Sequence, residues 1–363
     1  MITQLLLLST CGTSVLTNNA DKETERWLKS ITNNVALEGA DAVRLEAHVA
    51  KRGERLEKAD ASERRRLSAE INGISAVLDR WKPSRVQHLL VHSDTAVGKA
   101  AVDLVKAVLD KDGQQVQLLT ASGLRTDNLL SFREAIAHLT VQIEEWIPGH
   151  RQRGWRALFN LTGGFKSVNA YLQALGMIYA DGCVFFFEGS SELMEIPRLP
   201  VRLAEADEIR PYTSVFRRLK HGYQVSERDA VGVSDSLLMF DDGQATTSVW
   251  GDVVWSRVRK KLFAEGLLDP LSPKLVIREP VREAFRELEE ARRMQVNDAL
   301  DALSAHLDRV RALVKSEAFK KLSGNPSPPS THEFYLWSDG AAWRLFGHYE
   351  NERFIADSLG PHL

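Results

Sequence analysis

The segment from Phe159 to Ala180, FNLTGGFKSVNAYLQALGMIYA, constrains the fold more than any other part of the sequence. The overlapping run WRALFNL predicts a strand, the glycine pair predicts a turn, and the apolar spacing after Lys166 predicts a helix. A helix start offers unpaired N–H groups and the positive end of a dipole, and glycines let a ligand approach the backbone closely. Lysine and hydroxyl side chains add donors for a phosphate. The expected anion-binding residues are Thr162, Gly163, Gly164, Lys166 and Ser167.

Four more apolar runs predict buried strands that alternate with amphipathic helices: QLLLLST, VQHLLVHS, QQVQLLTAS and CVFFFEG. This alternation predicts an α/β, Rossmann-like domain with a parallel, doubly wound sheet over residues 1–205. Ligands bind beyond the carboxyl ends of the strands in such sheets. Polar residues and a glycine follow the first two strands at that edge, namely Ser9, Thr10, Gly12, Thr13, Ser14, Ser93, Asp94 and Thr95. We expect Asp94 and Thr95 also to cap the next helix.

A charged helical region, residues 22–81, separates the first two predicted strands. Its run Glu63-Arg64-Arg65-Arg66 is open to two interpretations, a nucleic-acid patch or, more in keeping with its mixed charge, a solvated helix face. The segment SDTAVGKA has Ser93 and Ala100 where a P-loop needs glycine and a hydroxyl, and the first strand lacks a Rossmann glycine fingerprint. These mismatches argue against a nucleotide triphosphatase and favour a sensor.

Composition excludes several other classes of protein. The formal net charge of −2 over 363 residues gives no global basicity for nucleic acid, so any RNA contact must be local. Only two cysteines are present and there is no CxxC pair, which argues against a disulfide framework or zinc site and fits a reducing cytoplasm. The opening MITQLLLLST lacks a basic start and is too short to span a bilayer, so we expect a cytoplasmic protein with no membrane partner.

The hydroxyl-rich loop after the first strand, the late TGGFKS turn and the Rossmann-like order together resemble a CARF domain, the sensor of CRISPR-associated effectors. The resemblance covers residues 1–205. It implies a homodimer that binds a cyclic oligoadenylate, taken here as cyclic tetra-adenylate, across paired copies of the polar residues given above. It implies no metal and no cofactor beyond this activator.

The middle segment, residues 206–272, shows a different pattern. SVFRRLKHGYQ and WSRVRKKLFAEGLL predict helices, and Asp241-Asp242-Gly243 predicts a hairpin turn between two short strands. Helices with a small ribbon are typical of a winged-helix-like module. Basic residues such as Arg257 and Arg259 allow DNA binding, but a structural connector between sensor and effector is the favoured interpretation.

The last segment, residues 273–363, predicts a strand, two helices, a glycine- and proline-punctuated loop and an antiparallel three-stranded meander. This order resembles the α+β fold of the RelE family of messenger-RNA interferases. The sequence KLSG at 321–324, Trp343-Arg344-Leu345 and the SLGPH end at 358–362 stand at the family's motif positions. Glu333 and Tyr335 replace basic residues usual in the family, and His362 stands at its final basic position.

The resemblance implies an endoribonuclease that cuts messenger RNA on the ribosome. Attack by the RNA's own 2′-hydroxyl needs a phosphate held in line, charge neutralisation and proton transfers, but no metal. Arg344 suits a phosphate clamp, and His348, four residues further on, shares its strand face. The candidate catalytic residues are Arg344, His348, His362, Tyr335 and Lys321, with Lys320 a further phosphate contact.

The sequence thus predicts a CRISPR-linked ribonuclease that is gated by cyclic oligoadenylate. One alternative is a HEPN-type ribonuclease, for which Arg133 and His138 have the R-x4-H spacing. Another is a ligand-responsive transcription regulator that uses the middle segment. A further possibility is that the sensor slowly cleaves its own activator.

Overall fold

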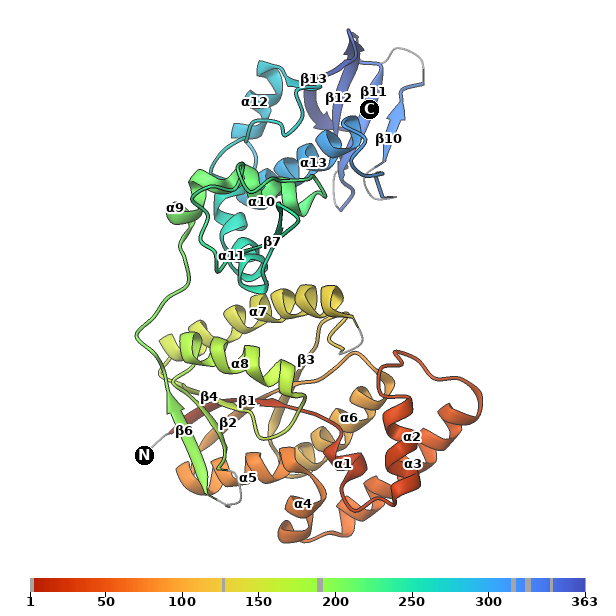
Figure 1. The fold of residues 1–363 in the computed structure, drawn as a ribbon, viewed down its shortest axis with the longest axis vertical. Helices are drawn as coiled ribbons and strands as arrows, with labels where there is room; N and C mark the ends of the chain where they lie inside the picture. The colour runs from red at the N-terminus through yellow and green to blue at the C-terminus, as the bar shows by residue number, and fades with distance from the viewer. Residues whose placement is uncertain are drawn as a thin grey trace. The chain divides into compact units, whose positions relative to one another are not determined.

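The computed structural model describes residues 3–125, 128–187, 192–314, 318–323, 328–339 and 342–362, except for the side chain of Leu130. The chain divides into two compact units, Met1–Leu203 and Ala204–Leu363, and each is described by itself (Figure 1). Within the described part of the chain, no helix combines the length and apolar character that a membrane crossing requires.

The first unit is built on a six-stranded sheet with the order β3-β2-β1-β4-β5-β6. Its strands are β1 (Gln4–Thr10), β2 (Arg85–Val91), β3 (Gln115–Leu119), β4 (Arg156–Asn160), β5 (Gly182–Phe186) and β6 (Leu193–Pro197). The first five are parallel, and β6 pairs antiparallel with β5. The predicted α/β, Rossmann-like fold is confirmed. The edge strand β6 was not predicted, because LMEIP is short and carries no alternating pattern.

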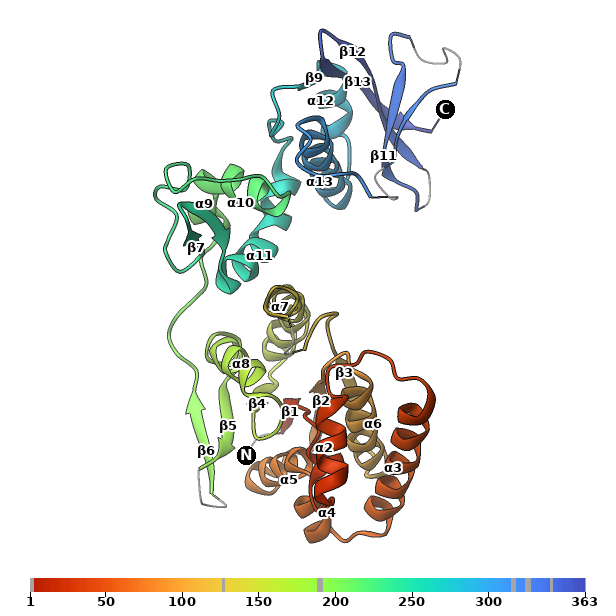
Figure 2. The same ribbon diagram turned by 45° about the vertical axis from the view of Figure 1, so that its right-hand side comes forward.

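Helices cover both faces of this sheet (Figures 1 and 2). α7 (Leu129–Gln152) and α8 (Lys166–Tyr179) lie over one face, and α5 (Ala69–Trp81) and α6 (Ala96–Lys111) over the other. Leu5 and Leu7 of β1 belong to the core cluster that includes α5 and α6, and all four leucines from Leu5 to Leu8 are fully buried. Burial on both faces explains why β1 reads as an unbroken apolar run.

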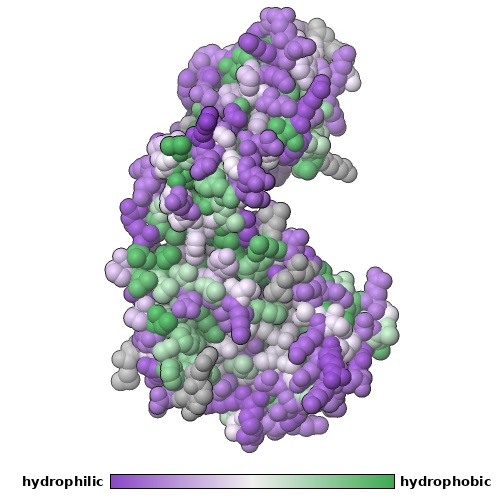
Figure 3. Space-filling model, in the orientation of Figure 1, coloured by the Kyte–Doolittle hydropathy of each residue, from purple (hydrophilic) through white to green (hydrophobic). Residues whose placement is uncertain are grey.

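The charged region between β1 and β2 folds into α1 (Ser14–Thr17), α2 (Lys22–Ser30), α3 (Gly39–Lys58), α4 (Ala61–Leu67) and α5. Hydrophilic residues predominate at the lower right of Figure 3, where Figure 1 places α2 and α3. Arg64 lies 3.6 Å from Asp112, and Arg65 pairs with Asp79. These ion pairs fit the solvated, mixed-charge face better than a nucleic-acid patch.

The second unit begins with α9 (Ala206–Ile209), η1 (Arg210–Tyr212) and α10 (Thr213–Lys220). The predicted hairpin is β7 (Leu238–Asp241) and β8 (Gln244–Thr247), and α11 (Val249–Glu265) follows it. Asp242 and Gly243 both have positive φ, 45° and 73°, as a two-residue turn of type I′ requires. The turn chemistry read from the sequence therefore specifies this ribbon.

A five-stranded sheet with the order β10-β11-β12-β13-β9 completes the second unit. Its elements are β9 (Leu275–Ile277), α12 (Glu279–Arg286), α13 (Glu290–Leu307), β10 (Phe319–Lys321), β11 (His332–Trp337), β12 (Trp343–Glu350) and β13 (Arg353–Pro361). The helices pack on one face, with Val281, Phe285 and Leu300 against Phe334 and Leu345. The α+β expectation is confirmed. The sequence pattern places Lys320 and Lys321 in the loop, whereas in the structure they belong to β10, which extends the meander by pairing with β11.

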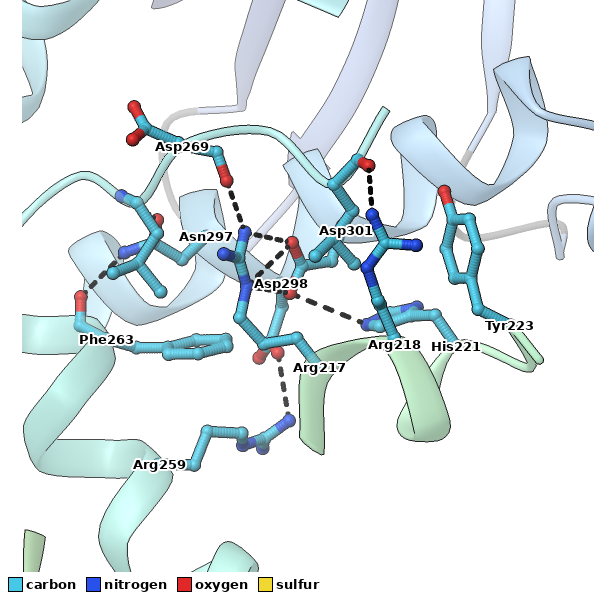
Figure 4. A network of polar contacts seen from close by, with 12 residues as sticks. Arg217, Arg218, His221, Tyr223, Arg259, Phe263, Asp269, Asn297, Asp298 and Asp301 are labelled. Atoms are coloured by element: carbon cyan, nitrogen blue, oxygen red, sulfur yellow. Dashed lines mark hydrogen bonds and ion pairs between the residues drawn. The ribbon is translucent and has the colours of Figure 1, made fainter. Parts of the chain in front are cut away.

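A buried polar network joins α10 to α13 (Figure 4). The Arg217 guanidinium donates to both carboxylate oxygens of Asp301 at 2.5 to 3.1 Å and to the Asp269 carbonyl at 2.9 Å. Asp301 is fully buried, and burial raises its pKa to about 6 although the bonds from Arg217 oppose that shift. The middle and last segments are thus linked by a desolvated ion pair inside one compact unit.

Candidate functional sites

The two loops predicted to bind an anion meet at the carboxyl edge of the first sheet. The Thr10 hydroxyl donates to the Gly163 carbonyl at 2.6 Å. A Cβ on Gly12 would lie 3.0 Å from the Gly164 Cα, and Gly164 has a φ of 86°. The contact between the 9–14 and 162–167 loops therefore needs glycine for close approach at one position and for left-handed backbone at the other.

We call the meeting point of the 9–14 and 162–167 loops the cradle, and it holds a carboxylate that the sequence pattern did not indicate. Glu70, fully buried at the start of α5, accepts from the Gly12 amide at 3.0 Å and from the Ser68 hydroxyl at 2.6 Å. The Ser14 hydroxyl also donates to Glu70. A Cβ on Gly163 would lie 2.6 Å from a Glu70 oxygen. Donors expected to hold a ligand's phosphate thus hold the protein's own carboxylate.

The start of α8 remains open to a ligand. Lys166 and Ser167 are exposed, and Lys166 makes no hydrogen bond or ion pair with any residue of the described ranges. Phe165 at the N-cap supplies no side-chain acceptor, so the first-turn amides are not capped from there. Thr162 is half-buried and donates to Asn160 at 2.6 Å. Of the 162–167 turn, Lys166, Ser167 and the helix start are therefore the groups best placed to meet an anion.

The polar residues after β2, and Ser9 in β1, form hydrogen bonds within the protein. Thr95 caps α6 by accepting from the Gly98 amide at 3.1 Å, and the hydroxyls of Ser93 and Thr95 lie 2.9 Å apart. Asp94 does not join this cap; it accepts from the Gly123 amide at 2.8 Å. Ser9 is fully buried, and its hydroxyl accepts from Asn160 at 3.1 Å. Ser93 and Thr95 are nearly as buried.

In the second unit, three predicted residues gather on the sheet face opposite α13. The Lys320 ammonium donates to the Tyr335 hydroxyl at 3.1 Å. The Arg344 guanidinium carbon lies 3.6 Å from the centre of the Tyr335 ring. Arg344 is only 5% exposed and donates to the carbonyls of Trp337 and Trp343 at 3.1 and 2.9 Å. It therefore supports the tyrosine ring from beneath and does not project into solvent.

Glu333 connects this group to the end of the sheet. One of its oxygens lies 3.9 Å from the Arg344 Nε and 3.8 Å from the Nε2 of His362. Glu333 is 8% exposed, whereas the His362 side chain is half exposed. The phenol cluster, defined as Lys320, Glu333, Tyr335, Arg344 and His362, thus joins two cations, a carboxylate, a phenol and an imidazole.

The Tyr335 phenol has a pKa below its usual value. The hydrogen bond from Lys320 is the main cause, and the charges of Lys320 and Arg344 add to it. Burial and Glu333 act in the opposite direction. A tyrosine made more acidic by two neighbouring cations is suited to accept a proton from an alcohol.

Two predicted residues lie outside the phenol cluster. His348 shares a strand face with Arg344 by alternation, but four residues of strand separate their Cα atoms by roughly 13 Å. Its Nδ1 instead lies 2.7 Å from Asp357, which also accepts from Ser330 at 2.9 Å. Lys321 follows Lys320 on β10 and therefore faces the other side of the sheet. Gly324, Gly340 and Leu363 lie outside the described residues.

The alternative sites receive little support from the structure. Arg133 and His138 lie on α7, a helix that covers the sheet of the first unit, and not in the second unit where an effector site is expected. Arg257 lies 3.2 Å from Glu205 and Arg259 lies 2.9 Å from Asp298, so both are neutralised within the unit. Among the residues described, no group of three His, Cys, Asp or Glu side chains is placed to hold a metal ion.

Comparison with known proteins bears on the first unit. Residues 65–199 match the model of a family described as CRISPR-associated protein (Cas_APE2256). This match links the chain to CRISPR systems. It begins within α4 and extends just beyond β6, so it contains Glu70 and the TGGFKS turn. No curated protein matches the chain.

Proposed function

We propose that this protein is a CRISPR-linked endoribonuclease that cuts messenger RNA on the ribosome when a cyclic oligoadenylate, cyclic tetra-adenylate in the first instance, binds its N-terminal unit. The phenol cluster is the observation that supports ribonuclease activity in the second unit. The family match of residues 65–199 supports the CRISPR context of the first.

Tyr335 is the group proposed to start the reaction. Lys320, 3.1 Å from its hydroxyl, favours the phenolate, which takes the proton from a ribose 2′-hydroxyl. The 2′-oxygen then attacks the adjacent phosphorus, the bond to the 5′-oxygen breaks, and a 2′,3′-cyclic phosphate is left. The exposed Lys320 ammonium is also placed to neutralise charge on the phosphate.

Arg344 and Glu333 are proposed as positioning residues. The guanidinium holds the Tyr335 ring by stacking under it and by two bonds to backbone carbonyls. Glu333 lies 3.9 Å from Arg344 and 3.8 Å from His362, and we propose that its charge orients both. The half-exposed imidazole of His362 is proposed to protonate the 5′-oxygen as it leaves. We assign His348 and Lys321 no part in this reaction.

Gating is proposed to occur through a homodimer of the first unit. Lys166 and the α8 start contact the phosphates of the ring in each protomer, and binding shifts the population toward the active form. The ribosome is proposed to hold the message in line for attack, which lets a small cluster suffice for catalysis.

The decisive chemical test uses a message carrying a single 2′-deoxynucleotide at the mapped cleavage position, presented on translating ribosomes with cyclic tetra-adenylate. The proposal predicts no cleavage at that position and 2′,3′-cyclic phosphate ends on the unmodified message. Tyr335→Phe should lower the cleavage rate by at least about a hundredfold, the usual contribution of general acid–base catalysis.

Normal cleavage at the deoxy position would show that another nucleophile attacks. Equal cutting of ribosome-free message would remove the ribosome from the proposal while leaving the phenol cluster in place. Phe keeps the ring that stacks on Arg344, so a loss of activity in Tyr335→Phe reports on the hydroxyl and not on packing.

A further inference from the structure

A polar pocket lies beside the cradle, between α1, α2 and α4. Its volume is about 550 Å³, within the range of small-molecule sites. Its walls are formed by Thr13, Thr17, Asn18, Asn19, Glu25, Leu28, Lys29, Thr32 and Arg66. We call it the insertion pocket, because α2 and α4 belong to the charged region between β1 and β2.

Two cations in the insertion pocket, Lys29 and Arg66, have no acidic partner among the described residues. Lys29 makes no ion pair with any residue the structure describes. Arg66 donates only to the Ser62 hydroxyl, at 3.1 Å, within the described ranges. Most other arginines of the insertion are paired, as in Arg44 with Glu23 and Arg55 with Glu63. The pocket thus brings two cations, Lys29 and Arg66, together among its lining residues.

The remaining lining fits a phosphorylated compound better than a bare ion. Threonine hydroxyls at 13, 17 and 32 and the Asn19 amide can bond hydroxyl or base groups, and Leu28 offers an apolar surface. Glu25 is the one carboxylate among the lining residues. Its negative charge repels phosphates, so a ligand with a single phosphate fits the pocket better than one with several.

We propose that the insertion pocket binds a phosphate monoester of mononucleotide size, with the phosphate between Lys29 and Arg66. The pocket is separate from the cradle. Thr13 and Thr17, at α1, line the pocket, whereas Ser14 of the same helix donates to Glu70 in the cradle. Binding of this monoester requires neither ribonuclease activity nor binding of cyclic oligoadenylate.

Calorimetric titration of the full chain with adenosine 5′-monophosphate, inorganic phosphate and adenosine tests the proposal. The monophosphate should bind most tightly, adenosine should not bind measurably, and added salt should weaken binding. Lys29→Ala and Arg66→Ala should each weaken binding about tenfold, the loss expected for one charge-assisted contact. Glu25→Gln should tighten it, because the like charge is removed.

Lys22→Ala is the matched control, since Lys22 is an exposed lysine at the start of the same helix and outside the pocket. It should leave the affinity unchanged, and thermal unfolding should show that all variants fold. Equal binding of adenosine, tighter binding of inorganic phosphate than of the nucleotide, or no saturable binding would overturn the proposal. So would an affinity that falls with Lys166→Ala but not with Lys29→Ala.

Discussion

At the scale of single residues, Glu70 gives the glycine-rich turn a structural role in addition to the predicted ligand-binding one. The turn has the donors and close backbone approach of an anion site, and an anion does occupy it, but that anion belongs to α5. Gly163 is required there because a Cβ would meet the Glu70 carboxylate at 2.6 Å. The glycines thus have a structural role that does not depend on any ligand.

Glu70→Ala should destabilise the first unit by about 3 kcal/mol, because the buried Gly12 amide and the hydroxyls of Ser14 and Ser68 lose their acceptor. Denaturant unfolding, followed by hydrogen exchange of β1 and β4 amides, measures this loss for the first unit. Glu46→Ala, at an exposed glutamate of α3, is the control and should change stability little. Equal stability of the two variants would contradict the role given to Glu70.

The pH dependence of cleavage tests the pairing of Lys320 with Tyr335. In the proposed reaction the phenolate is active, so the rate rises as pH passes upward through the pKa of Tyr335. Lys320 lowers that pKa, so Lys320→Ala should raise it and move the ascending limb to higher pH. The rate in single turnover across the pH range is the measurement.

Lys321→Ala provides the comparison for this profile, since Lys321 is adjacent in sequence but on the other face of β10. It should leave the position of the ascending limb in place. A shift of the same size in both variants would mean that general positive charge, and not the bond to Tyr335, sets the profile.

At the scale of elements, local sequence patterns specified most of the fold. The apolar run of β1 and the turn at Asp242-Gly243 depend on neighbours along the chain, and both were predictable. β6 and β10 were missed because each is short and is defined by the strand it pairs with.

The candidate sites were less predictable for a related reason. Glu70 meets Gly12 across 58 positions, and nothing in its surrounding helical pattern distinguishes it from solvent-exposed glutamates. The aromatic-Arg-Leu motif identified Arg344, but its position under Tyr335 depends on the register of β11 and β12. The sequence alone does not show that Lys320 and Lys321 face opposite sides of a sheet, because that depends on this stretch being a strand.

The contact between α10 and α13 can be tested by removing its buried ion pair. Arg217→Ala should destabilise the second unit by about 3–5 kcal/mol, since it leaves Asp301 buried without its ion pair. Hydrogen exchange of amides in α13 and β12 measures the effect. Arg228→Ala, at an exposed arginine, should have almost none. Loss of protection restricted to α10 would show that the middle segment unfolds independently.

At the scale of the whole molecule, we propose that one compact unit senses the ligand and that the other cleaves RNA. Lys166 and the phenol cluster belong to different units, so their variants should fail in different ways. Lys166→Ala should raise the concentration of cyclic tetra-adenylate needed for half-maximal cleavage while leaving the maximal rate intact. Tyr335→Phe should lower the maximal rate and leave ligand affinity intact.

The most direct test is the rate of message cleavage on translating ribosomes, measured with and without cyclic tetra-adenylate. We expect rapid cleavage with the ligand and little without it, and Lys166→Ala should need a higher ligand concentration for half-maximal cleavage. Equal cleavage with and without the ligand would contradict this proposal.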